Sequence, residues 1–172
     1  MEELDNIIRQ SLESLTAELH QGLWTGQRER EIVSLFCFGH LLQHCCPSTI
    51  LADPTQIALE VAVPQIAGQQ ELTGKCSQKD QVCKDIVIWK TPRATCWNTE
   101  GNPAMHPLTV LEWKHNTSAL SQYDLQWLGS YSTTMKDFVG YAVCTNWPPR
   151  TFTLLCARVC FGNIDQQWLR LA

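Results

Sequence analysis

Two ionisable residues stand two positions apart at the end of an apolar run, Pro107 to Asn116. On a β-strand, alternate side chains face the same side, so Glu112 and Lys114 would share one face while Trp113 faces the other. Burying a carboxylate and an ammonium group costs free energy unless they pair or hold a cation. Because Glu-x-Lys triplets also arise by chance, the pattern predicts a site only if a second acid reaches the same sheet edge.

Such an acid lies upstream. The run from Lys84 to Trp89 is rich in β-branched and aromatic residues and carries Asp85 near its start, which predicts a buried strand. If this strand pairs with the one that ends at Lys114, then Asp85, Glu112 and Lys114 would converge.

The composition favours one globular domain. The chain has 172 residues, of which 44% are hydrophobic and 17% are charged. A net charge of −4 argues against nonspecific coating of nucleic acid. Basic residues nevertheless cluster around the Asp85 strand, either as a nucleic-acid groove or as a solvated hairpin: Lys75, Lys79, Lys84, Lys90 and Arg93.

Nine cysteines are present. The residues from Met1 to Asp5 are acidic and show no secretory signal, and no run is long enough to span a membrane. We therefore expect a cytoplasmic protein whose cysteines are reduced and mostly buried. A zinc site near His40, His44 and Cys45 is the alternative, although no Cys-x2-Cys knuckle is present.

Three helices are expected. Apolar residues at three-and-four spacing predict an amphipathic N-terminal helix over 1–21, with Leu4, Ile8, Leu12, Leu15 and Leu19 on one face. A second helix is expected over 27–43, with Glu29 just ahead of an apolar stripe formed by Ile32, Leu35, Phe36, Gly39 and Leu42. A third follows Asn116, with Ser121 and Asp124 as a capping pair.

Strands are predicted over 57–63, 84–89, 108–113, 138–144 and 151–159, and the chain is expected to close with a short polar segment. The nearly continuous apolar strands indicate a sheet that is covered on both faces. The expected fold class is therefore α/β, with a central mixed β-sheet flanked by helices and an extra N-terminal helix.

The order of these features resembles the PD-(D/E)xK nuclease superfamily, which has the restriction-endonuclease-like fold. The likeness covers residues 25–160. It comprises a helix with Glu29 in Glu-Arg-Glu-Ile-Val, a strand containing Glu60, a strand opened by Asp85, and a strand that ends in Glu-x-Lys. The chain departs from the pattern in carrying Lys84 instead of proline before Asp85, and residues 91–106 would form a β-hairpin extension.

The resemblance implies metal-dependent hydrolysis of phosphodiesters. A cation neutralises the phosphate charge, and Mg²⁺ prefers carboxylate and carbonyl oxygens. Asp85, Glu112 and the Trp113 carbonyl would hold Mg²⁺ or Mn²⁺, and Lys114 would assist the attacking water. Glu29, or less favourably Glu60 or Glu31, would orient that water or hold a second ion. Contacts with nucleic acid are expected at Lys84, His115, Gln122, Tyr123 and Gln126.

The leading hypothesis is a metal-dependent nuclease that acts on DNA, with a homodimer as one arrangement that the resemblance implies. The alternative is a catalytically inactive module of the same fold that binds protein or nucleic acid, which the acidic net charge and the seven tryptophans favour. An unrelated α/β domain with a coincidental Glu-x-Lys triplet is the third interpretation.

Overall fold

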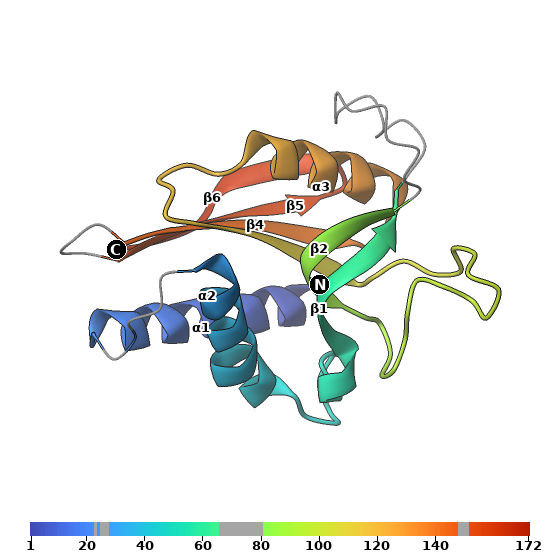
Figure 1. Cartoon of the computed structure of the whole chain (residues 1–172), viewed down its shortest axis with the longest axis horizontal. Helices are drawn as coiled ribbons and strands as arrows, with labels where there is room; N and C mark the ends of the chain where they lie inside the picture. Colours follow the sequence, from blue (N-terminus) through green and yellow to red (C-terminus); the bar gives the residue numbers. More distant parts are fainter. Residues whose placement is uncertain (23, 25–27, 66–80, 148–151) are drawn as a thin grey trace.

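A six-stranded mixed sheet forms the middle layer of the fold, with helices on both of its faces (Figure 1). The computed structural model describes residues 1–22, 24, 28–65, 81–147 and 152–172. Its α-helices are α1 (Glu2–His20), α2 (Glu29–Leu35) and α3 (Gln122–Thr134). Its strands are β1 (Ile57–Pro64), β2 (Gln81–Ile88), β3 (Thr109–His115), β4 (Val139–Asn146), β5 (Thr153–Cys160) and β6 (Asn163–Leu171).

The strands follow chain order across the sheet, from β1 at one edge to β6 at the other. Among the strands that the structure describes, β3 and β4 pair in parallel and the other neighbouring pairs are antiparallel. A parallel pair needs a crossover connection, and α3 provides it. The prediction of an α/β fold with a mixed sheet flanked by helices is confirmed.

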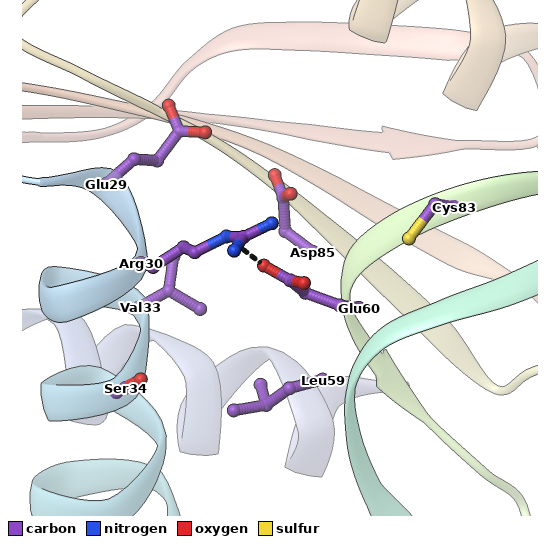
Figure 2. A pocket seen from close by; sticks show the side chains of 8 residues that line it. All are labelled: Glu29, Arg30, Val33, Ser34, Leu59, Glu60, Cys83 and Asp85. Carbon is purple, nitrogen blue, oxygen red and sulfur yellow. Dashed lines mark ion pairs between the residues drawn. The ribbon is translucent and has the colours of Figure 1, made fainter.

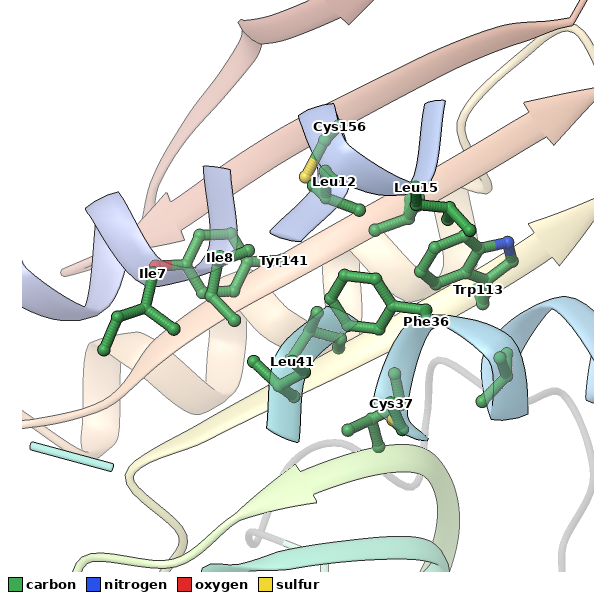
Figure 3. Close-up of a cluster of buried hydrophobic side chains, with 14 of the residues drawn as sticks. Ile7, Ile8, Leu12, Leu15, Phe36, Cys37, Leu41, Trp113, Tyr141 and Cys156 are labelled. Carbon is green, nitrogen blue, oxygen red and sulfur yellow. The ribbon is translucent and has the colours of Figure 1, made fainter. Parts of the chain in front are cut away.

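Two hydrophobic clusters fill the space between the layers. On the face covered by α1 and α2, Leu15, Phe36 and Trp113 lie in one cluster, with 5.2 Å between the Phe36 and Trp113 ring centroids (Figure 3). On the opposite face, α3 contributes Trp127 and Tyr131 to the second cluster. Trp113 therefore points to the α1 and α2 side, as strand alternation predicts.

The N-terminal helix is an integral part of this core. All five residues of its predicted apolar stripe are buried. Asp5 also accepts hydrogen bonds from the Tyr141 hydroxyl and from Nε of Arg158, both at 2.6 Å. The Arg9 guanidinium donates to the Trp168 carbonyl at 3.2 Å. These bonds fix α1 across strands β4, β5 and β6.

The second helix departs from its predicted form. The α-helical hydrogen bonds of α2 end at Leu35, a π-helical turn covers Phe36–His40, and a 3₁₀ turn covers Leu41–His44. A π turn holds more residues than an α turn and so shifts the phase of the stripe. As a result Leu41 is fully buried where the sequence pattern predicted Leu42.

The end of the chain and the long connection also differ from expectation. Residues after 160 form β6 instead of a polar segment. Because β6 is an edge strand whose residues 163–167 are exposed, it lacks the apolar alternation that identifies buried strands. The predicted hairpin over 91–106 is an irregular loop with one isolated bridge, between Trp97 and Pro103.

Eight cysteines fall within the described residues, all unpaired, and five of them are buried: Cys37, Cys96, Cys144, Cys156 and Cys160. This confirms the expectation that most act as core residues. In the same part of the chain, no helix combines the length and the hydropathy that a membrane crossing requires.

Candidate functional site

The strands β2 and β3 stop pairing where the predicted acids begin. Their last paired residues are Ile86 and Leu111. Beyond this point the Asp85 side chain takes the place of a backbone acceptor. Its Oδ2 accepts the backbone N–H of Trp113 at 2.7 Å. The two strand ends therefore separate and expose polar groups between them.

The ammonium group of Lys114 lies at the centre of this opening. It donates to the Trp113 carbonyl at 2.7 Å. It also lies 3.8 Å from Asp85, 3.8 Å from Asp124 and 3.9 Å from Glu29. Burial would lower the pKa of Lys114, but Asp124, Asp85 and other nearby carboxylates raise it above its ordinary value, so the ammonium stays charged.

The carboxylate of Glu112 lies on the α3 face of the sheet and is 5% exposed. Its partner is Lys84 from β2, whose ammonium group pairs with Oε1. Burial raises the pKa of Glu112 to about 7, an effect that Lys84 opposes and Asp85 reinforces. Glu112 and Lys114 thus share the face opposite Trp113.

Lys84 is itself buried, with 1% of its surface exposed. Its ammonium lies 3.5 Å from the centroid of the Trp127 ring on α3, in addition to its ion pair with Glu112. The prediction that Lys84 contacts nucleic acid is therefore wrong, because no phosphate can reach it. Of the other basic residues in the predicted cluster, Lys75 and Lys79 lie outside the described residues.

Glu29 comes to the site from the first turn of α2. Its Oε2 accepts the backbone N–H of His115 at 3.0 Å, while Oε1 faces Lys114. His115 is half-buried and its Nδ1 lies 3.0 Å from the Thr145 hydroxyl. Burial lowers the pKa of His115, against the opposing effect of Glu31.

The two additional acids occupy different places. Glu31 closes the first turn of α2, where its Oε2 accepts the backbone N–H of Arg28 at 3.0 Å. Glu60 on β1 pairs with Arg30 at 2.5 Å. Both Glu60 and Asp85 line a cavity of about 450 Å³ between α2 and the sheet (Figure 2).

The helix α3 begins beside the site. The Ser121 hydroxyl accepts the backbone N–H of Asp124 at 3.3 Å, which confirms the predicted cap. Gln122, Tyr123 and Gln126 are exposed on α3. Burial and the nearby Asp124 carboxylate raise the pKa of Tyr123, so its hydroxyl is neutral and available as a hydrogen-bond donor.

Sequence reasoning missed the role of the Asp124 side chain. Asp124 is 5% exposed and its carboxylate faces Lys114. A signal was present, because Trp127, Leu128 and Tyr131 follow it at positions three, four and seven further along. That spacing places Asp124 on the buried face of the helix, where a carboxylate needs a partner.

The site gathers four carboxylates and two ammonium groups: Glu29, Asp85, Glu112, Asp124, Lys84 and Lys114. Negative charge is therefore in excess when all are ionised. Within the described residues, no three His, Cys, Asp or Glu side chains are grouped closely enough to hold a metal ion between them. A metal ion held by carboxylates of this set would therefore need further ligands, such as the backbone carbonyl of Trp113 and water.

Comparison with known proteins returned no family model, no curated protein and no solved structure that matches the chain.

Proposed function

We propose that the protein is a Mg²⁺- or Mn²⁺-dependent nuclease that hydrolyses phosphodiester bonds in DNA, built on a restriction-endonuclease-like fold. One observation carries the proposal. At the point where β2 and β3 stop pairing, the Lys114 ammonium lies 3.8 Å from Asp85 and 3.9 Å from Glu29, which comes from α2. Glu112 stands two residues before Lys114 on the same strand. A structural salt bridge does not need an opening between strands or four acids.

The donor set fits a hard divalent cation. Carboxylate and carbonyl oxygens are the ligands that Mg²⁺ prefers, and the excess negative charge favours a dication. Asp85, Glu112 and the Trp113 carbonyl would hold the ion. When bound, it would neutralise the charge of the phosphodiester and acidify a water molecule.

The remaining groups position the reactants. The charged Lys114 ammonium would orient the attacking water and stabilise negative charge on the phosphoryl oxygens in the transition state. Asp124 and Glu29 hold that ammonium in place. Lys84 holds one oxygen of Glu112, which leaves Oε2 for the ion. Gln122, Tyr123 and Gln126 on the exposed face of α3 would contact the nucleic acid beside the scissile phosphate.

A second candidate is a catalytically inactive module of the same fold that binds nucleic acid or protein. The buried pair of Lys84 and Glu112 favours it, because the pair satisfies both charges without a metal.

The test is cleavage of labelled single-stranded, duplex and branched DNA, and of RNA, with Mg²⁺ or Mn²⁺. Asp85→Ala and Lys114→Ala should abolish cleavage, while Lys136→Ala, an exposed lysine outside the site, should not. Cleavage that survives both site substitutions would contradict the proposal. No cleavage of any substrate, with no divalent-ion binding by calorimetry, would favour the inactive module.

A further inference from the structure

A cavity of about 450 Å³ opens directly beside the candidate catalytic residues (Figure 2). Glu29 and Asp85, which face Lys114, also line this cavity. Val33 from α2 and Leu59 from β1 give it an apolar part. Small-ligand sites share this combination of a few hundred Å³, apolar walls and a few placed polar groups.

An ion pair connects the two sides of the cavity. Arg30 on α2 reaches Glu60 on β1, with Nε and Oε1 2.5 Å apart (Figure 2). The two side chains are 82% and 46% exposed. Because water screens exposed ion pairs, this one contributes little to stability and can open when a ligand competes for either partner.

The backbone at Glu60 is held in an unusual conformation. Its φ is 51°, in the left-handed region that residues other than glycine rarely adopt. It stands between the paired residues Leu59 and Val61, opposite Asp85 on β2. Strained residues of this kind concentrate at ligand-binding sites. Here the strain accompanies a carboxylate that faces the cavity.

We infer that this cavity binds one unpaired nucleobase of the substrate, next to the phosphate that Lys114 faces. The identity of the ligand rests on the proposed function. Leu59 and Val33 would contact the face of the base, and the planar guanidinium of Arg30 would stack on it. The Glu60 carboxylate would accept a hydrogen bond from an exocyclic amino group, such as N4 of cytosine.

A base within a duplex cannot occupy such a cavity, because its neighbours cover both faces and its partner covers the pairing edge. The net charge of −4 points the same way, since binding a duplex relies on many phosphate contacts with basic residues. Stacking of single bases needs fewer such contacts. The substrate class is therefore single-stranded DNA, or a strand with an unpaired base.

The test measures binding by fluorescence anisotropy with one labelled oligonucleotide, as a single strand and as a blunt duplex, in EDTA and in Ca²⁺. We expect the single strand to bind about tenfold more tightly, the amount that stacking of one base supplies. Leu59→Trp fills the cavity and should remove the preference. Ile164→Trp, which adds the same ring to an exposed position of β6, should retain it.

A second arm keeps the inference testable if Leu59→Trp does not fold. The parent should bind oligo(dC) more tightly than oligo(dT), and Glu60→Gln should reduce that difference. Duplex binding as tight as single-strand binding, or a folded Leu59→Trp variant with an unchanged preference, would overturn the inference. Because binding is read without cleavage, a single-strand preference in a protein that cuts nothing would reject the nuclease alone.

Discussion

Lys84 and Glu112, on neighbouring strands, pair inside the protein, with only 1% and 6% of their side chains exposed. Each residue taken alone would be costly to bury, and each removes much of the cost of the other. The pair holds the nearly buried Glu112 carboxylate at the base of the candidate site. The stability and the chemistry of the site are therefore linked through these two residues.

Lys84→Met should lower the free energy of unfolding by about 3–5 kcal/mol, because it leaves the Glu112 carboxylate buried without its partner. Urea denaturation followed by tryptophan fluorescence measures this. Adding Glu112→Gln to Lys84→Met should recover part of the loss. A Lys84→Met variant as stable as the parent would show that Lys84 and Glu112 do not form an ion pair in solution.

Stability should fall as pH rises through the titration range of Glu112. Burial raises its pKa from 4.5 to about 7, so the folded state binds more protons than the unfolded state between these values. The resulting stabilisation is complete below pH 4.5 and is lost as pH approaches 7, by at most about 3 kcal/mol. Urea midpoints across this range should decline in the parent relative to Glu112→Gln. A constant difference between the two proteins would contradict the prediction.

Under the proposed nuclease activity, Asp124→Asn should slow catalysis without unfolding the protein. The cap of α3 uses the backbone N–H of residue 124, which the substitution keeps. The Lys114 ammonium, however, loses a carboxylate at 3.8 Å that holds it. We expect kcat to fall by about 10–100-fold, as for other supporting residues, with KM for DNA little changed. Gln126→Ala, on the exposed face of α3, is the control, and it should change KM rather than kcat.

Two glycines offer a matched test of the packing between α3 and the sheet. A Cβ on Gly140 would lie 2.7 Å from Cδ2 and 3.1 Å from Cβ of Leu128, whereas one on Gly129 would meet only Ile164, at 3.8 Å. Gly140→Ala should therefore destabilise the protein by about 1–3 kcal/mol. Gly129→Ala, inside a helix, should stabilise it by about 1 kcal/mol. Thermal unfolding of the two variants checks the order.

Local periodicity was sufficient to predict much of the fold and which side chains of β3 share a face. Strand alternation placed Trp113 opposite Glu112 and Lys114, because alternation is a property of the strand itself. The apolar spacing of α1 predicted its buried face for the same reason. Periodicity could not predict the pairing between strands. The opening at Asp85 depends on where the pairing between β2 and β3 ends, which is not a local property of either strand.

The errors have tertiary causes. Lys84 looks like a surface residue in the sequence, and only the position of Trp127 on α3 shows that it is enclosed. The π turn after Leu35 and the edge strand β6 likewise leave weak local signals. The net charge of the chain gave no sign of the candidate site either, because a total charge does not show that four acids lie close together.

The bonds of α1 have a consequence for synthesis of the chain. Asp5 binds Arg158 across 153 residues, and Arg9 binds Trp168 across 159. The helix leaves the ribosome more than a hundred residues before these partners on the sheet. The turns over 36–44 can pack against its apolar face early, but the part that faces β4, β5 and β6 is covered only when the last strands have been made.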